Sequence, residues 1–147
     1  MSEPRVRVFF YGSYMNRAVL REVDLVPTRF EAARLDGYDI RISPRANLIP
    51  SSERCVYGVI VEATHAELDR LYSHARDVLG ETYLPHPVLA QTVTGAWLAA
   101  LCYIAPFMET RPPESAYLDR ILQPAREFGF PSWYVNHLEA QRHGQQS

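Results

Sequence analysis

A run of β-branched and aromatic residues near the N-terminus, Val6 to Phe10, is followed at once by Tyr11-Gly12-Ser13. Such a run predicts a buried strand, and the glycine and serine after it predict a tight turn. Glycine lets the backbone adopt a positive φ or come close to a ligand, and Ser13 adds a hydroxyl and an N–H group. The turn can therefore present donors to a carboxylate, a phosphate or a developing oxyanion. An ordinary β-turn would use the same residues.

The residues that follow strengthen the functional interpretation of this turn. Asn16 is a suitable N-cap for a short helix from Arg17 to about Val23. The turn from Gly12 to Met15 then lies between a strand and a helix N-terminus, where backbone donors and the helix dipole favour anions. We therefore expect the amides from Gly12 to Met15 to line the main pocket.

Composition limits the classes of protein to which the chain can belong. Its 147 residues are 47% hydrophobic and 22% charged, with a formal net charge of -2. These values predict one globular domain over 1–147 with a flexible tail after about 141, and they give no sign of a nucleic-acid or membrane partner. Cys55 and Cys102 lie in apolar strand-like runs, which favours buried free thiols over a disulfide or metal site. Without a signal peptide or a long apolar run, we expect a cytoplasmic location.

The middle of the chain predicts further strands separated by turns. Phe30 to Leu35 and Tyr38 to Ile42 have strand patterns, and Asp36-Gly37 between them is a strong turn signal. Ser43 to Glu53 is predicted to be a polar loop of the kind that often forms the rim of a site. Its polar candidates, each of which would equally suit a solvated loop, are Arg41, Arg45 and Asn47.

Three more strand-like segments complete a set of roughly six. Cys55 to Val61 contains Gly58, which allows close packing or a bulge. Tyr83 to Thr94 is interrupted by Pro85 and Pro87, which predicts an edge strand or a distorted one. Trp97 to Ala105 is the longest apolar run and the best candidate for a central strand.

Helices are predicted at irregular intervals among these strands. Thr64 and Glu67 have the spacing of a capping box at a helix start. Pro112 opens a second helix that reaches about Glu127, and Pro131-Ser132 starts a last one that reaches about Gln141. The order is neither strict βαβ alternation nor an all-β meander. It predicts an α+β fold, a small mixed and mostly antiparallel barrel or curled sheet flanked by helices.

Several short motifs come in one order along nearly the whole chain. The strand with Tyr11-Gly12-Ser13 is followed by the Arg45–Pro50 loop, the Val56–Val61 strand and a helix with Leu68-Asp69-Arg70-Leu71. Tyr83, a strand with Tyr103, and the segments Pro113–Leu118 and Ala125–Pro131 then follow. In this order and spacing the chain resembles the γ-glutamylcyclotransferase-like family, which includes the plant AIG2-like proteins.

The resemblance implies a fold, an activity and a site. The fold is a small mixed barrel with the Tyr-Gly-Ser turn at the mouth of the pocket. In the implied reaction, the α-amine of a γ-glutamyl group attacks its own γ-carbonyl, which yields 5-oxoproline and a free amine without a metal or organic cofactor. The turn binds the γ-glutamyl group, a glutamate after the mid-chain helix handles protons, and a tyrosine of the late helix, here Tyr117, borders the pocket.

The chain departs from the family pattern at that glutamate. Alignment on Leu71 places Tyr72-Ser73-His74-Ala75 where the carboxylate usually stands, and the nearest carboxylates are Asp77 and Glu81. We expect Glu81 to be the acid/base, because it closely precedes Tyr83 and would lie among tyrosines that raise its pKa by desolvation. Histidine chemistry offers His74 and His86 as alternatives.

Two hypotheses of different class therefore stand, with a third behind them. The first is a γ-glutamyl cyclotransferase with a displaced acid/base, acting on a small-molecule γ-glutamyl substrate. The second is a binding module that keeps the pocket and lacks turnover, and the third is an enzyme acting on another amide. The sequence leaves the amine half of the substrate and the oligomeric state open. The residues expected to bind substrate are Tyr11, Gly12, Ser13, Tyr14, Met15, Tyr83 and Tyr117.

Overall fold

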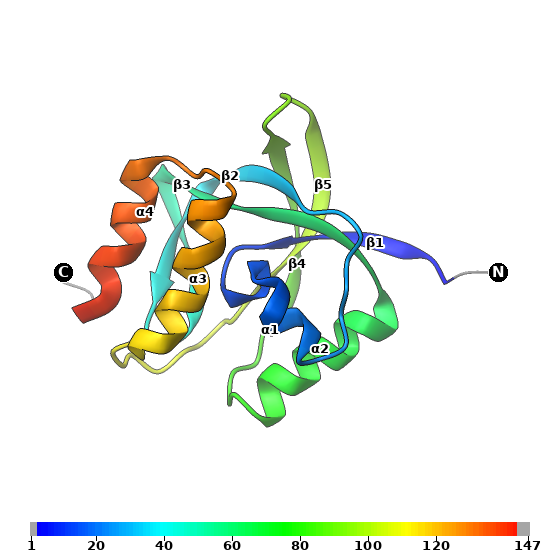
Figure 1. The fold of residues 1–147 in the computed structure, drawn as a ribbon, viewed down its shortest axis with the longest axis horizontal. Helices are drawn as coiled ribbons and strands as arrows, with labels where there is room; N and C mark the ends of the chain where they lie inside the picture. The colour runs from blue at the N-terminus through cyan, green and yellow to red at the C-terminus, as the bar shows by residue number, and fades with distance from the viewer. Residues whose placement is uncertain (1–2, 144–147) are drawn as a thin grey trace.

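The computed structural model describes residues 3–143 and shows a closed barrel of five strands with helices around it (Figure 1). Going around the barrel, the strand order is β1-β3-β2-β4-β5. This is the α+β barrel that the sequence predicts. The elements are β1 Arg5–Phe10, a 3₁₀ turn Ser13–Met15, α1 Arg17–Arg21, β2 Glu31–Ile42, β3 Ala46–Thr64, α2 His65–Asp77, β4 Leu84–Thr92, β5 Trp97–Ile104, α3 Ser115–Glu127, α4 Ser132–Glu139 and a 3₁₀ turn Ala140–His143.

Strand β1 has a neighbour on each side, as expected for the strand that carries the Tyr-Gly-Ser turn. It pairs with β3 in the antiparallel sense along its whole length and meets β5 in the parallel sense at Val8. A Cβ atom on Gly58 of β3 would lie 2.3 Å from the backbone oxygen of Phe10. Gly58 is thus needed for close packing, one of the two roles predicted for it.

Strand β2 differs from its prediction, because the Asp36-Gly37 signal does not produce a turn. The chain stays in one strand from Glu31 to Ile42, and the pairing with β3 shifts register between Asp36 and Tyr38. Gly37 has a φ of +91° at this irregularity. A left-handed glycine suits a bulge as well as a turn, so the predicted six strands become five.

Strand β3 also differs, because most of the predicted polar loop at 43–53 is strand. Only Ser43–Arg45 turns the chain, and the strand begins at Ala46. Its first residues pair with Tyr38–Ile42 of β2. Pro50 and the polar residues Ser51–Arg54 are tolerated because Ile49–Arg54 is largely exposed, whereas Ala46–Leu48 is buried. A fixed strand start, rather than a loose loop, therefore forms this side of the site.

Strand β4 has the partial pairing that its prolines predict. It pairs with β5 from Leu84 to Gln91, but with β2 only at Gln91 and Thr92. Pro85 and Pro87 thus lie where β4 has a strand partner on one side only, so their missing N–H groups interrupt little of the ladder. Strand β5, the predicted central strand, lies between β4 and β1.

The helix ends follow the sequence signals closely. The Asn16 side chain accepts a hydrogen bond from the Ala18 amide, and Thr64 with Glu67 forms the predicted capping box. Helix α3 starts at Ser115, after the predicted proline start, and α4 ends at Glu139. The predicted flexible tail lies largely outside the described residues.

The end of the described chain is attached to β2 through Gln141, whose side chain is 1% exposed. Its Oε1 accepts from the Ile42 amide at 2.6 Å, and its Nε2 donates to the Ile40 oxygen at 3.2 Å. These two backbone groups would otherwise be buried without partners, which is costly. The Gln141 side chain thus forms with the backbone of β2 the hydrogen bonds that a neighbouring strand would otherwise form.

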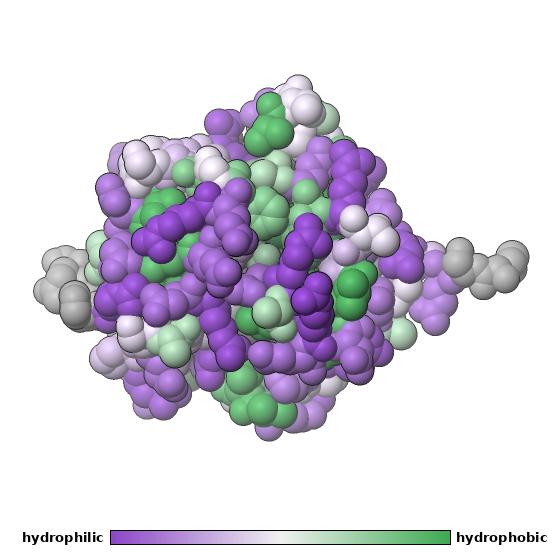
Figure 2. All heavy atoms as spheres, in the orientation of Figure 1, coloured by the Kyte–Doolittle hydropathy of each residue, from purple (hydrophilic) through white to green (hydrophobic). Residues whose placement is uncertain are grey.

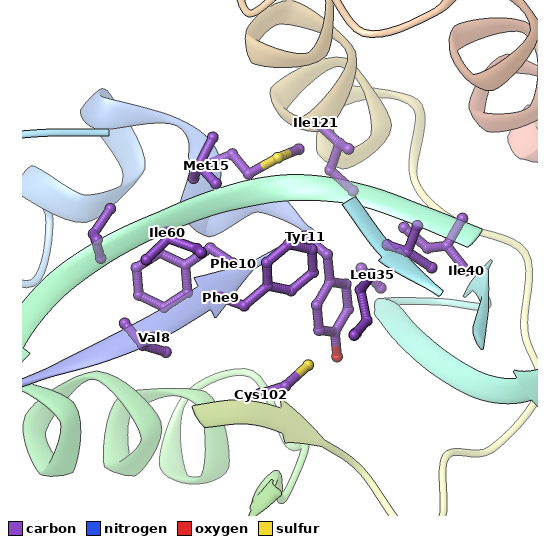
Figure 3. Close-up of a cluster of buried hydrophobic side chains, with 14 of the residues drawn as sticks. Val8, Phe9, Phe10, Tyr11, Met15, Leu35, Ile40, Ile60, Cys102 and Ile121 are labelled. Atoms are coloured by element: carbon purple, nitrogen blue, oxygen red, sulfur yellow. The ribbon is translucent and has the colours of Figure 1, made fainter. Parts of the chain in front are cut away.

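Strand β1 supplies much of the core. Figure 3 shows Val8, Phe9, Phe10 and Tyr11 along it, with Cys102 of β5 nearby. Cys102 is buried and Cys55 is half-buried, and both are free thiols. The face in Figure 2 is mostly hydrophilic, with separate small apolar patches, one of them at the tip of the β4–β5 hairpin. No helix in the described part of the chain is long and apolar enough to cross a membrane.

Candidate active site

A pocket opens where β1 ends, and its empty space, counting the part open to solvent, is about 450 Å³. We call it the site pocket. Its walls come from the turn after β1, the β2–β3 turn, α2 and the segment after it, β5 and α3, so residues far apart in the sequence meet here. The lining residues are Phe9, Phe10, Tyr11, Gly12, Ser13, Tyr14, Arg45, Ala46, Tyr72, Leu79, Glu81, Tyr83, Tyr103 and Tyr117.

The turn after β1 is a single 3₁₀ turn, and four of its five predicted residues line the site pocket. Gly12 has a negative φ of −113°, so glycine is required here because there is no space for a side chain, and not because the backbone is left-handed. A Cβ atom there would lie 2.8 Å from the Cβ of Ala46. Within residues 3–143, the N–H groups of Ser13 and Tyr14 donate no hydrogen bond, as expected for the first amides of a helical turn.

Met15 is the predicted site residue that does not line the pocket. Its amide donates to the Gly12 oxygen at 3.1 Å, and the residue is 1% exposed within the core. The 3₁₀ turn rotates this side chain inward, away from the pocket. The binding surface of the turn therefore ends at Tyr14.

Two predicted tyrosines form the opposite wall and make hydrogen bonds with the backbone of Ala46. The Tyr83 hydroxyl donates to the Ala46 oxygen at 2.7 Å, and the Tyr117 hydroxyl accepts from the Ala46 amide at 2.8 Å. The Tyr117 hydroxyl also lies 3.8 Å from the position of a Cβ on Gly12. Tyr117 therefore faces the turn, as predicted, and fixes the spacing between the turn and Ala46.

The remaining aromatic residues make the wall rigid. The Tyr11 hydroxyl donates to the Tyr103 oxygen at 2.7 Å, and Figure 3 shows the ring pointing into the barrel. Tyr72 stacks on Tyr103 with ring centroids 3.8 Å apart and meets Tyr14 edge-on at 5.7 Å. Sequence analysis missed Tyr103 and Tyr72 as site residues, because aromatic residues in such patterns usually belong to a core.

The Tyr14 hydroxyl is the unpaired polar group of this wall. It is buried, and it has no hydrogen-bond partner in the described part of the chain. Burial raises the pKa of Tyr14, the nearby Tyr117 adds to the rise, and the Arg45 guanidinium opposes it. The hydroxyl is thus a neutral donor in the pocket wall.

Glu81 brings a carboxyl group into the site pocket, and the turn after α2 places it. Gly80 adopts a φ of +80°, and the Glu81 amide donates back to the Ala75 oxygen at 3.1 Å. Glu81 is 8% exposed, and no ion pair within 4.0 Å includes it among residues 3–143. Burial raises the pKa of its carboxyl, whereas Arg111 and Arg45 oppose the rise and Glu109 adds to it.

The other proton carriers considered from sequence lie outside the site pocket. Asp77 is exposed and pairs with Arg76 at 3.0 Å. Neither His74 nor His86 lines the pocket, and His86 lies in a separate groove together with Arg41. Asn47 is used structurally, because its side chain exchanges two hydrogen bonds with the backbone of Ala105.

Of the polar candidates from the predicted loop, Arg45 therefore lines the pocket. Throughout residues 3–143, no group of three or more His, Cys, Asp or Glu side chains is arranged to hold a metal ion. The polar groups that line the pocket are the Glu81 carboxyl, Arg45, backbone amides and tyrosine hydroxyls, which suit a polar organic ligand.

The fold and the pocket together are those of a small barrel with an aromatic-walled pocket at the end of its first strand. Residues 8–121 match the family model described as gamma-glutamyl cyclotransferase, AIG2-like, and the chain belongs to this family. No curated protein sequence matches the chain.

Solved structures show the same fold. A structure titled gamma-glutamyl cyclotransferase has a TM-score of 0.82 at 21% identity, covering 98% of this chain and 92% of that one. An uncharacterized protein from Homo sapiens has a TM-score of 0.84 at 22% identity, with coverage of 99% and 92%. A yeast gamma-glutamyl cyclotransferase, described as specific to glutathione, has a TM-score of 0.63 at 16% identity, with coverage of 94% and 95%.

Proposed function

We propose that this protein is a γ-glutamyl cyclotransferase that releases 5-oxoproline and a free amine from a γ-glutamyl compound. Membership of the family supports the reaction class. The observation that carries the proposal is Glu81, a buried carboxyl without an ion-pair partner in the described chain, in the same pocket as the Tyr11–Tyr14 turn. A carboxyl whose pKa is raised by burial is suited to accept a proton and return it.

The reaction begins with proton removal from the substrate. A free α-amino group has a pKa of about 7.7, so at neutral pH most of it is protonated and cannot attack. Glu81 accepts a proton from the α-ammonium. The amine then attacks the γ-carbonyl carbon of the same molecule, and a new C–N bond closes a five-membered ring.

Attack turns the γ-carbonyl oxygen into an oxyanion, which needs hydrogen-bond donors. The amides of Ser13 and Tyr14, free of other partners among the described residues, supply them. When the intermediate collapses, the original γ-amide C–N bond breaks. Glu81 gives its proton to the departing nitrogen, and the regenerated carboxylate takes one of the two hydrogens that the ring nitrogen still carries. Transfer of that proton to the released amine restores the carboxylate, so 5-oxoproline leaves with a neutral ring amide and the amine leaves as an ammonium.

The rigid tyrosine wall supplies the remaining part of catalysis. Attack within one molecule is fast only when the reacting atoms are held close together. Tyr83 and Tyr117 fix Ala46 from both sides, and Tyr72 stacks on Tyr103. A pocket with fixed walls can hold the γ-glutamyl chain in the curled conformation that cyclisation requires.

The test is 5-oxoproline release from a panel of γ-glutamyl amines and amino acids, with Glu81→Gln as the decisive variant. Glutamine keeps the shape and removes the base, so turnover should fall by about 100-fold or more. Substrate affinity should change far less. Glu62→Gln on β3 is the matched control, because Glu62 is exposed and lies outside the pocket. Full turnover in Glu81→Gln would contradict the assignment.

A non-catalytic binding module is the second candidate. It is favoured by the absence of a carboxylate at Tyr72–Ala75, where the family pattern places one, and by the way Tyr72 fills the wall instead. The same panel distinguishes the two. Ligand binding measured by calorimetry, with no 5-oxoproline formed by the wild-type protein, would favour the binding module.

A further inference from the structure

A groove separate from the site pocket lies beside the start of β3 and the end of β5. Its empty space, counting the part open to solvent, is about 990 Å³, and we call it the side groove. None of the residues that line it also lines the site pocket. Its walls are largely apolar and come from Leu48–Pro50 of β3, Ile104 of β5 and the segment Ala105–Met108.

The segment 106–110 along this groove is held at both ends by buried side chains. The Asn47 side chain accepts from the Ala105 amide at 2.9 Å and donates to the Ala105 oxygen at 3.0 Å. At the other end, the Ser43 hydroxyl donates to the Arg111 oxygen at 2.8 Å and accepts from its amide at 3.1 Å. Between these anchors, the backbone of 106–110 makes no hydrogen bond with other backbone groups of residues 3–143. We call this segment, with its fixed ends and exposed middle, the anchored loop.

The anchored loop presents an aromatic side chain to solvent. Phe107 is 79% exposed, whereas the other five phenylalanines of the chain are buried or half-buried. Large exposed apolar side chains beside a groove mark interaction surfaces, and buried aromatic residues supply much of the binding energy at the centre of an interface. Because the ends of the loop are already fixed, less conformational entropy is lost when Phe107 is buried by a partner.

The charges of this surface are opposite in sign and do not meet within one chain. Arg41 and His86 are the ionisable residues that line the side groove. Glu109 is exposed on the anchored loop and is not among the residues that line the groove. In the described part of the chain, no ion pair within 4.0 Å includes Arg41 or Glu109. The surface therefore combines a positive groove with a negative loop.

We propose that two copies of this chain associate through this surface, with Phe107 of each copy in the side groove of the other and Glu109 of each copy facing Arg41 of the other. A two-fold axis brings the same patch of both copies together, so such a patch must be complementary to itself. The side groove supplies a hollow and a positive charge, and the anchored loop supplies an aromatic side chain and a negative charge. A partner of another kind would need only one of these two features.

Sedimentation equilibrium over a range of protein concentrations tests the proposal, because it measures the dissociation constant of a dimer without any substrate. We expect a wild-type dimer whose Kd rises by about 30-fold or more in Phe107→Ser, since an aromatic residue at the centre of the interface is lost. Val93→Ser is the matched control. Val93 is 80% exposed and does not line the side groove, so the Kd of this variant should equal that of wild type.

Charge reversal tests how the two copies are arranged. Arg41→Glu and Glu109→Arg should each raise the Kd by about 10-fold or more, because like charges then face each other across the interface. When both changes are made in one chain, every pair in the dimer is reversed at once, and the Kd should return close to the wild-type value. Arg7→Glu, at an exposed position of β1 outside the groove, should leave the Kd unchanged.

A wild-type protein that stays monomeric at every concentration would overturn the proposal, and so would a dimer that Phe107→Ser leaves as tight as before. A double variant as weak as its two parents would show that Arg41 and Glu109 do not face each other, which also overturns it. Arg41, Phe107 and Glu109 are all exposed, so these variants should fold, and thermal denaturation checks this. None of the measurements involves 5-oxoproline, so the outcome is independent of the proposed function.

Discussion

Two aromatic-walled hollows of this molecule differ in how their polar groups are used. The empty space, counting the part open to solvent, is about 450 Å³ in the site pocket and about 720 Å³ in a second cleft beside the turn of the β4–β5 hairpin. In the second cleft, Arg34 pairs with Asp36 at 3.0 Å and donates to Gln91 at 3.1 Å. The residues of this cleft are Ala32, Ala33, Arg34, Tyr57, Gln91, Thr92, Val93, Gly95, Phe128, Gly129, Phe130 and Pro131.

The two hollows differ in which polar groups lack a partner: in the second cleft it is the Nε of Arg34, whereas in the site pocket it is groups of three kinds. Glu81 has no ion-pair partner, the Tyr14 hydroxyl has no hydrogen bond, and the Ser13 amide is free, all with respect to residues 3–143. Buried polar groups are normally paired, so exceptions need a reason. The comparison teaches that neither size nor aromatic content marks the site. A carboxyl, a hydroxyl and a backbone amide that lack partners in one pocket mark it.

The largest expected difference in turnover between the two hollows comes from replacing one glycine of each by alanine. Gly12→Ala places a Cβ 2.8 Å from that of Ala46, so the turn must move away from the opposite wall. A displacement of this kind can lower turnover by about 100-fold. Gly129→Ala in the second cleft is the counterpart: its φ of +74° makes alanine strained, at a cost of about 1 kcal/mol in stability. Turnover should stay at the wild-type value there, and equal activity losses in the two variants would refute the comparison.

A smaller difference in kcat/KM is expected when either of two buried tyrosine hydroxyls is removed. The hydroxyls of Tyr14 and Tyr134 both lack a hydrogen-bond partner in the described chain. Tyr14 lines the site pocket, whereas Tyr134 packs behind the second cleft with its ring 5.2 Å from that of Tyr57. Tyr14→Phe should lower kcat/KM by about 10-fold, because a donor to the substrate is lost. Tyr134→Phe should leave kcat/KM unchanged. Steady-state kinetics of both variants would show it, and equal kcat/KM values would argue against a role for the Tyr14 hydroxyl.

The smallest expected effect is on the free energy of unfolding when one charged residue of each hollow is replaced by glutamine. The change should be stabilising in the site pocket and destabilising in the second cleft. The pKa of Glu81 is raised by burial, so the folded state favours the neutral carboxyl. The stability that this preference contributes is fully present below the pKa of the carboxyl in the unfolded chain. It is lost as pH rises through the pKa of the carboxyl in the folded protein. Glu81→Gln should therefore be more stable than wild type at pH 7, and the difference should shrink on acidification. Arg34→Gln removes an exposed ion pair and should lose under about 1 kcal/mol.

Urea denaturation at several pH values measures both differences, and Glu62→Gln again serves as the control for charge removal alone. A Glu81→Gln variant that is less stable than wild type at pH 7 would show that the carboxylate supports the fold. The same profile for turnover should show activity lost as pH falls through the raised pKa of Glu81, because the base must be ionised to accept a proton.

Local signals predicted the elements of this fold better than their connections. The Asn16 cap and the capping box of Thr64 and Glu67 depend on neighbouring residues, and they were predicted correctly. Asp36-Gly37 was predicted to be a turn, but the same dipeptide also suits a bulge. Only the pairing of β2 with β3 distinguishes the two. Ala46 could not be recognised at all, since its importance comes from Tyr83 and Tyr117, which are distant in sequence.

The site shows the same division between local and distant information. The residues of the Tyr11–Tyr14 turn were found because one short stretch carries strand, glycine and serine together. Tyr103 was missed because nothing local distinguishes a pocket tyrosine from a core one. Arg111 was not considered, because its position depends on hydrogen bonds from Ser43. The role predicted for Glu81 remains a prediction, although the structure places this residue in the pocket.

The attachment of Gln141 to β2 has a consequence for how the protein is made. A chain leaves the ribosome from its N-terminus at about 5–20 residues per second. Strand β2 therefore emerges about 100 residues before the side chain that satisfies Ile40 and Ile42. During that interval two backbone groups of β2 stay open to water or to another chain. Because Ser43–Arg45 follows directly, the wall that carries Arg45 becomes fixed only after Gln141 has emerged.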